Sequence, residues 1–234
     1  MTSAGLVRVP RAWGEGGEAM CEAAMMDIGV PESATVALST LDEQVAAVAA
    51  ALPDVPIVLG GCCCAHIGAA AGLSDRHGRI SVIWLDAHGD LNTPESSPSG
   101  NEWGMPFRRI LDDGHAAVED CVLLGARQLD PPEADFIAHT GLATSSSMVG
   151  SVVSGTAGAY VAFDCDVVDQ ADIDCFMPEP GGPALEECIR MVQAVSALTP
   201  VLGLGLTGLV ASEANPGRLR RIIDAALPET ASRS

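Results

Sequence analysis

The sequence predicts a three-layer α/β/α fold built on a mostly parallel sheet. Apolar runs of strand length alternate with segments of helical period, and these runs are continuously apolar rather than alternating. Continuous apolar strands are typical of a sheet that helices cover on both faces. Alternation of strands and helices produces parallel strands joined by crossover connections. The chain has 234 residues, and we expect residues 1–234 to form one domain.

Five strands are predicted, at residues 55–60, 80–85, 121–124, 159–163 and 201–206. Six helices are predicted, at residues 41–52, 65–73, 106–112, 132–139, 184–198 and 217–227. The longest irregular stretch, residues 92–104, is polar and rich in Gly, Ser and Pro. It follows a central strand directly, and a long loop in that place is more often functional than idle.

Composition excludes several classes of protein. The formal net charge is −19, and all twelve basic residues are Arg. Such an acidic surface repels phosphate backbones, so we expect no nucleic-acid partner. No apolar run approaches the ~20 residues of a membrane span, and no apolar stretch that would suggest a signal peptide follows Arg8 and Arg11. We therefore expect a cytoplasmic protein without a membrane partner.

The eight cysteines do not read as a disulfide framework. Cys62, Cys63 and Cys64 are consecutive, and adjacent cysteines rarely pair for geometric reasons. No CxxC pair suggests a structural zinc site. Free thiols or a metal ligand are the expected roles in a chain without an export signal.

Acidic side chains gather where predicted strands end. One predicted strand is followed by Asp86, His88 and Asp90, each two residues after the last. Another is followed by Asp164 and Asp166, which have the same spacing. Ligands of open parallel sheets collect at the carboxyl ends of the strands. Converging carboxylates repel one another unless cations intervene, and an oxygen-rich set with one imidazole suits Mn²⁺. Two such ions roughly 3.5–4 Å apart would lower the pKa of a bridging water.

Each acidic run by itself has an ordinary alternative explanation, namely a helix N-cap or a solvated loop with an incidental histidine. Both runs end an apolar strand, and this coincidence favours a metal site.

Five segments resemble motifs of the arginase–agmatinase (ureohydrolase) family, in the family's order. DAHGDLNTP (86–94) with SGN (99–101) is similar to DAHxDxNTP…SGN, and FDCDVVD (163–169) to SFDxDxxDP. GGCCC (60–64) resembles GGDHS, GARQLDP (125–131) resembles GxRxxDP, and EANP (213–216) resembles EVNP. The resemblance implies a binuclear manganese centre and hydrolysis of a C–N bond in a guanidino or amidino compound by hydroxide bridging two metals.

The resemblance also implies roles for single residues. One metal would be held by Asp86, Asp90 and Asp164, with Cys63 in a histidine's place, and the other by Asp86, His88, Asp164 and Asp166. Asp90 would help proton transfer to the leaving amine, and Glu213 would hold the guanidinium. Asn92, Ser97, Ser99 and Asn101 would bind the α-carboxylate of a small guanidino acid, and Asp130 its α-amino group. Relatives commonly form trimers or hexamers.

Two positions depart from the family pattern, and the chain is short for the family. Cys63 replaces a histidine ligand, which admits the softer Zn²⁺ or Fe²⁺, or leaves an inert thiol beside a weakly held position. Trp103 stands where arginases place a proton-shuttling histidine, and indole cannot titrate. A degenerate member that binds metal or ligand without turnover is therefore the alternative to a hydrolase of guanidino acids. A deacetylase-like amide hydrolase fits less well, because a neutral amide needs no partner such as Glu213.

Overall fold

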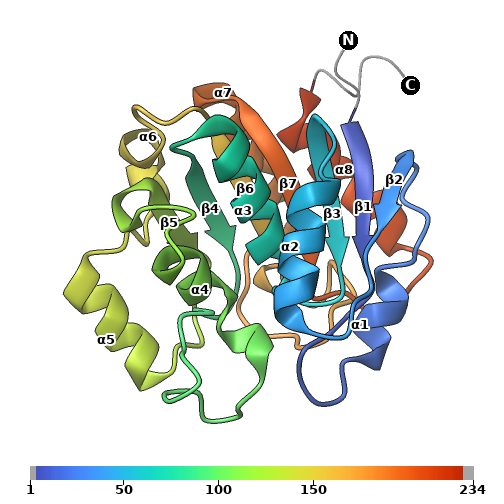
Figure 1. Cartoon of the computed structure of the whole chain (residues 1–234), viewed down its shortest axis with the longest axis horizontal. Coiled ribbons are helices and arrows are strands. Elements are labelled where there is room, and N and C mark those ends of the chain that lie inside the picture. Colours follow the sequence, from blue (N-terminus) through green and yellow to red (C-terminus); the bar gives the residue numbers. More distant parts are fainter. Residues whose placement is uncertain (1–3, 229–234) are drawn as a thin grey trace.

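The sheet has seven strands, all parallel, and confirms the predicted α/β/α class (Figure 1). A computed structural model describes residues 4–228. The strands are β1 (Ala4–Val9), β2 (Glu32–Thr35), β3 (Val55–Gly60), β4 (Ser81–Leu85), β5 (Cys121–Leu124), β6 (Ala159–Asp164) and β7 (Val201–Thr207). Their order across the sheet is β2-β1-β3-β7-β6-β4-β5.

Helices lie on both faces of the sheet. They are α1 (Glu18–Ala23), α2 (Leu41–Ala51), α3 (Ala65–His77), α4 (Pro106–Asp112), α5 (Pro131–Thr140), α6 (Val149–Val152), α7 (Leu185–Leu198) and α8 (Asn215–Ala226). Helices α2, α3 and α4 cover one face, and α7 and α8 cover the other (Figure 1). The structure has two separate clusters of buried hydrophobic side chains, which include aromatic residues as well as aliphatic ones. No helix of residues 4–228 is both long and apolar enough to cross a membrane.

Helix α3 packs closely on α2 because small residues lie between them. A Cβ on Gly68 would come within 2.7 Å of the Val45 carbonyl oxygen, and one on Gly72 within 2.7 Å of the Ala49 carbonyl oxygen. Every residue of α3 from Ala65 to Leu73 is buried, and all of them except His66 are apolar or glycine.

The sequence prediction missed β1 and β2. Arg8 interrupts the apolar pattern of β1, yet it is only 7% exposed. Its guanidinium donates to Glu32 Oε2 on β2 at 2.7 Å and to the Ala24 and Met26 carbonyl oxygens at 2.8 Å each. A buried arginine with all these partners is compatible with a strand, although its charge hides the strand in a hydropathy pattern. Strand β2 is short and mostly exposed at the sheet edge, so it carries no apolar signal.

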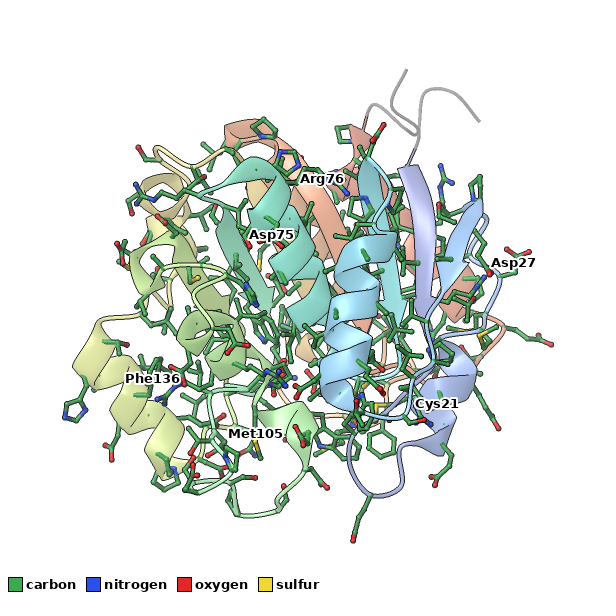
Figure 2. All side chains as sticks on the ribbon, viewed as in Figure 1. Cys21, Asp27, Asp75, Arg76, Met105 and Phe136 are labelled. Carbon is green, nitrogen blue, oxygen red and sulfur yellow. The ribbon has the colours of Figure 1, made fainter. Side chains whose placement is uncertain are left out.

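The parallel arrangement brings every strand's carboxyl end to one edge of the molecule. Figure 2 labels Cys21 and Met105 at this edge, and Asp75 and Arg76 near the end of α3 at the opposite edge. In the order β3-β7-β6-β4, the turns after β3, β4 and β6 lie near one another at this edge of the sheet.

Candidate metal centre

Three strand ends supply the acidic and sulfur side chains of the site. The turn 61–64 leads from β3 into α3, residues 86–90 follow β4, and β6 ends at Asp164 itself. All of these carboxylates are buried, with Asp86 1%, Asp90 5%, Asp164 6% and Asp166 5% exposed. The edge of the sheet predicted to hold ligands therefore concentrates negative charge away from solvent.

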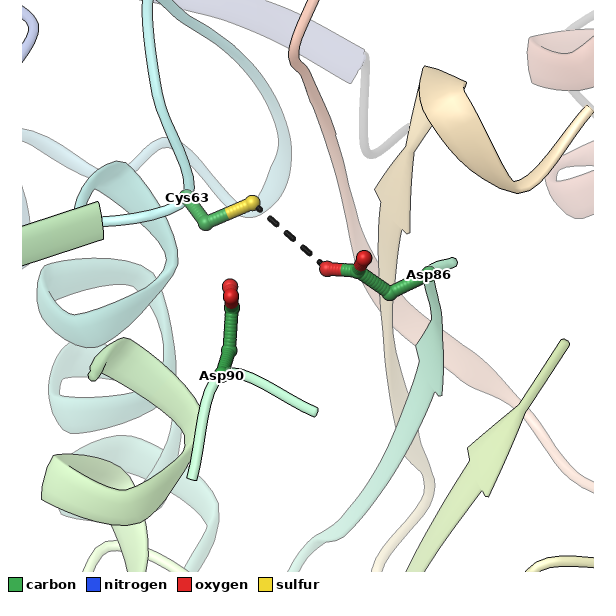
Figure 3. A group of neighbouring side chains, drawn as sticks. All are labelled: Cys63, Asp86 and Asp90. Atoms are coloured by element: carbon green, nitrogen blue, oxygen red, sulfur yellow. Dashed lines mark hydrogen bonds between the residues drawn. The ribbon is translucent and has the colours of Figure 1, made fainter. Parts of the chain in front are cut away.

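The first cluster consists of Cys63, Asp86 and Asp90 (Figure 3). One potential ligand atom from each lies within 4.8 Å of the other two. Asp90 Oδ2 is buried and has no hydrogen-bond partner among the described residues, and Asp90 has a φ of 50°. A non-glycine residue in the left-handed region and an unpartnered buried carboxylate oxygen are both costly. A cation at this position would provide the missing partner.

The second cluster consists of Asp86, His88 and Asp166. His88 Nδ1 lies 2.9 Å from Asp166 Oδ2 and 3.5 Å from Asp86 Oδ1. Asp86 belongs to both clusters, and its oxygens diverge: Oδ1 faces His88, whereas Oδ2 lies 3.9 Å from Cys63 Sγ. Asp86 is therefore the residue that the two groups of potential ligands share.

Asp164 lies beside the first cluster. Its Oδ2 accepts hydrogen bonds from Cys63 Sγ at 2.7 Å and from Thr207 Oγ1 at 3.1 Å, and its Oδ1 accepts from the Asp166 amide at 3.0 Å. Gly208 has a φ of 72°, and a Cβ there would come within 2.1 Å of Asp164 Oδ1. Only glycine at this position leaves room for the Asp164 carboxylate.

Burial and mutual repulsion raise the pKa values of the acids. Burial first, and then Asp166, raise the pKa of Asp164 to about 7, and burial with Asp86 raises the pKa of Asp166 to about 6. Burial opposes the imidazolium of His88, but hydrogen bonds to Asp166 and Asp86 outweigh it and raise its pKa to about 12. Burial, reinforced by Asp164, raises the pKa of the Cys63 thiol well above its usual range. Without cations, the site therefore retains protons.

These shifts predict how stability depends on pH when cations are removed. Carboxylates with raised pKa values bind more protons in the folded chain than in the unfolded one, so the free energy of unfolding falls as pH rises from about 4 to about 7. The raised pKa of His88 acts in the same direction above about pH 6.5.

In a chelator, we therefore expect a higher Tm at about pH 5 than at about pH 8, and each kcal/mol corresponds to roughly 2–4 °C in a chain of this size. Thermal unfolding at the two pH values measures this difference. It should shrink in Asp164→Asn, and added Mn²⁺ should raise Tm mainly at the higher pH. Greater stability of the chelated protein at the higher pH would contradict the electrostatic account.

The clusters form the floor of a cavity of about 330 Å³. The expected substrate residues Asn92, Ser97, Ser99 and Asp130 line it, together with apolar side chains of Met20, Trp103, Phe176 and Met177. Asn101 is not among the lining residues, and its Oδ1 accepts a hydrogen bond from the Glu15 amide at 3.1 Å. No Arg of residues 4–228 lines the cavity, so the charged groups that these residues contribute are carboxylates apart from His88.

Residues 17–209 match the model of the arginase family. The matched region contains every residue of the two clusters. The chain belongs to the arginase family.

Individual relatives agree with this assignment. The arginase of Bacillus caldovelox is 35% identical over 143 residues, which cover 50% of this chain and 48% of that protein. The chain thus spans about half the length of this curated relative. The solved structure of Bacillus caldovelox arginase has a TM-score of 0.83 at 22% identity and covers 97% of this chain and 98% of that chain. The solved structure of formimidoylglutamase from Bacillus subtilis has a TM-score of 0.79 at 17% identity. The match covers 100% of this chain and 88% of that chain. At these identities, the likeness to solved structures concerns the fold.

As an arginase-family chain, the protein differs from the expectation at Glu213. The structure places Glu213 on the exposed segment before α8, and it does not line the cavity. Strand β7 ends at Thr207, six residues earlier, so the carboxylate is carried away from the sheet edge. The neighbouring Asn215 is buried and donates to the Asp174 and Val210 carbonyl oxygens at 2.8 and 2.9 Å. Asn215 of the EANP segment therefore anchors the loop before α8, and Glu213 lies outside the cavity that Asn92, Ser97, Ser99 and Asp130 line.

Trp103 lines the cavity in this arginase-family chain. Its ring meets Phe176 edge to face, with centroids 5.8 Å apart. A Cβ on Gly14 would come within 2.5 Å of the Trp103 ring, so the early loop is shaped around it. The indole therefore forms an apolar wall.

Sequence reasoning missed two carboxylates near the centre. Glu133 lines the cavity, is 3% exposed, and accepts hydrogen bonds from the amides of Leu91 and Asp130 at 2.9 Å each. The D-P-P-E run that begins α5 is a capping-box signature that could have located it. Glu179 Oε1 lies 3.6 Å from His88 Nε2, on a segment with no recognisable motif.

Arg127 fixes the segment that carries Glu179. Its guanidinium donates to the carbonyl oxygens of Asp166 at 2.7 Å, Glu179 at 2.9 Å and Pro180 at 3.1 Å. It also donates to the carbonyl oxygens of Gly125 and Val167 at 3.2 Å each. One side chain thus joins the loops that follow β5 and β6 to the segment beside His88.

Proposed function

We propose that this protein hydrolyses a C–N bond of a guanidino or amidino compound, with a guanidino acid as the favoured substrate. The observation that carries the proposal is the pair of potential metal clusters sharing Asp86 on the floor of a cavity lined by polar loop residues. A cationic guanidinium is complementary to this acidic floor.

The donor set fits two divalent cations. Carboxylates and one imidazole suit Mn²⁺, while a Cys63 thiolate would increase the affinity for Zn²⁺ or Fe²⁺. The ligands we propose are Cys63, Asp86, His88, Asp90, Asp164 and Asp166. When bound, the cations would polarise the substrate and lower the pKa of a water molecule enough to supply the nucleophile.

Asp90 is the proposed carrier of the proton. Its Oδ2 has no partner among the described residues, and Asp90 lines the cavity. Burial, reinforced by Asp86, raises its pKa well above the usual range. A carboxylate oxygen that lines the cavity can accept a proton from the attacking water and pass it to the leaving nitrogen.

The loop residues have free donors for a substrate carboxylate. Ser97 Oγ accepts from the Gly100 amide at 3.0 Å and Ser99 Oγ from the Asn101 amide at 3.2 Å, which leaves both hydroxyl hydrogens available. Asn92 Nδ2 donates to Asp130 Oδ2 at 2.8 Å and has a second hydrogen for the ligand. Asp130 would then face an α-amino group. Homo-oligomerisation is proposed from family membership alone.

Urea-type product release tests the proposal. Protein loaded with Mn²⁺ is incubated with guanidino acids, guanidines that lack the carboxylate, and formimidoyl compounds, and the released product is quantified. We expect turnover with a preference for acids, and its loss in Asp166→Asn. If protein with two bound cations converts none of these compounds, the non-catalytic metal-binding alternative becomes the better account.

A further inference from the structure

A chain of buried polar groups runs beneath the metal centre and takes no part in the proposed reaction. His66, on the first turn of α3, is 0% exposed. Its Nδ1 lies 2.7 Å from the Tyr160 hydroxyl on β6, and its Nε2 lies 3.1 Å from Thr207 Oγ1 at the end of β7. Thr207 Oγ1 in turn lies 3.1 Å from Asp164 Oδ2 and 3.2 Å from Cys63 Sγ.

The surrounding structure is shaped to hold the imidazole in one orientation. A Cβ on Gly205 would come within 2.2 Å of the Tyr160 hydroxyl and 2.3 Å of His66 Nδ1, so a side chain at this position is incompatible with both groups. The His66 ring also packs edge to face on Trp84, with centroids 5.0 Å apart. Trp84 Nε1 donates to Asp86 Oδ2 at 3.0 Å, so the same packing reaches the shared carboxylate.

The donors and acceptors available to these groups decide which group donates in each hydrogen bond of the series. Burial lowers the pKa of His66 to about 3, so the ring is neutral and carries one N–H. If Tyr160 donates to Nδ1, then Nε2–H donates to Thr207, and the Thr207 hydroxyl donates to Asp164 Oδ2. If instead His66 Nδ1–H donates to Tyr160, the Tyr160 hydroxyl hydrogen has no acceptor among the described residues. Leaving a buried donor unsatisfied is costly, which favours the first direction.

We propose that His66 is a positioning residue that orients the Thr207 hydroxyl toward Asp164 and thereby holds the Asp164 carboxylate beside Cys63. The inference rests on the proposed metal centre and adds a set of hydrogen-bonded residues that support one of its ligands. Ligating carboxylates and imidazoles depend on such outer partners for their orientation, and losing one typically weakens metal binding 10–100-fold.

Binding of Co²⁺ tests the proposal, because the sulfur-to-cobalt charge-transfer band reports the geometry around Cys63. We expect His66→Leu and Thr207→Val each to weaken Co²⁺ binding by roughly 10–100-fold and to shift this band. The double variant should bind no more weakly than the weaker single variant, since both changes break the same chain. His66→Gln, which can still present an N–H, should recover part of the affinity.

Ser81→Ala is the matched control. Ser81 is also 0% exposed and hydrogen-bonded, to Thr156 Oγ1 at 3.1 Å, but it lies at the opposite end of the sheet. It should lower Tm without changing Co²⁺ affinity. Thr207→Val replaces only the hydroxyl by a methyl group of similar size and keeps the test decisive if His66→Leu fails to fold.

Two outcomes would overturn the inference in distinguishable ways. If both His66→Leu and Thr207→Val lower Tm but keep wild-type Co²⁺ affinity and spectrum, the buried chain only packs the core. If wild-type protein itself takes up no Co²⁺, the proposed metal centre fails, and the positioning role fails with it. Fully additive losses in the double variant would show that the two residues act separately.

Discussion

Asp86→Asn is expected to remove most of the bound metal from both clusters and to abolish turnover. Asp86 is the residue that the clusters share, with Oδ1 facing His88 and Oδ2 facing Cys63. A neutral amide of the same size keeps the shape and removes the charge. We expect cation affinity to fall by at least about 100-fold, more than the loss of an outer partner produces.

Elemental analysis of protein purified under reducing conditions measures this effect. Bound metal should fall from near two equivalents to below one. Asp130→Asn is the control, because Asp130 lines the cavity outside both clusters and should leave the metal content unchanged. In chelator, Asp86→Asn should melt above the wild type, since a buried charge is gone. Two equivalents retained by the variant would contradict the shared-ligand arrangement.

Substitution of Cys63 is expected to alter the first cluster alone. Cys63→Ala should leave about one equivalent of metal, held by the second cluster. Cys63→His should bind Mn²⁺ more tightly, because an imidazole suits this ion better than sulfur and the buried thiol must first lose its proton.

The pH dependence of Mn²⁺ binding distinguishes a thiolate ligand from an inert thiol. Burial raises the pKa of the Cys63 thiol, so binding through sulfur must release its proton. Apparent affinity should then rise by about tenfold per pH unit more steeply in the wild type than in Cys63→His. Mn²⁺ titrations at several pH values give both slopes. Equal metal content and equal slopes in the wild type, Cys63→Ala and Cys63→His would show that Cys63 is not a ligand.

The central strands and the acidic turns were predictable because each carries a local signal. Strands β3 to β7 are apolar runs, and the turns after β4 and β6 carry their carboxylates at a spacing of two. Strand β1 was not predictable in this way. Its buried Arg8 is balanced by Glu32, 24 residues away, and no local pattern reports that pairing.

The remaining features of the site depend on contacts between distant segments. A motif match assigned Glu213 to the substrate, but the length of the segment after Thr207 decides where that side chain lies. Likewise, His66 and Thr207 are 141 residues apart in sequence, and only the placement of α3 against β7 brings them together. The fold could therefore be predicted from the sequence, whereas the surroundings of the candidate metal ligands could not.

Arg127 holds the loops on one side of the cavity in place before a substrate binds. Its guanidinium already satisfies carbonyl oxygens from the loops after β5 and β6 and from the segment carrying Glu179. Those loops lose their conformational entropy during folding, so ordering them adds little to the cost of binding. The wall beside His88 is thus preorganised, and a ligand that fits it needs no loop closure on that side.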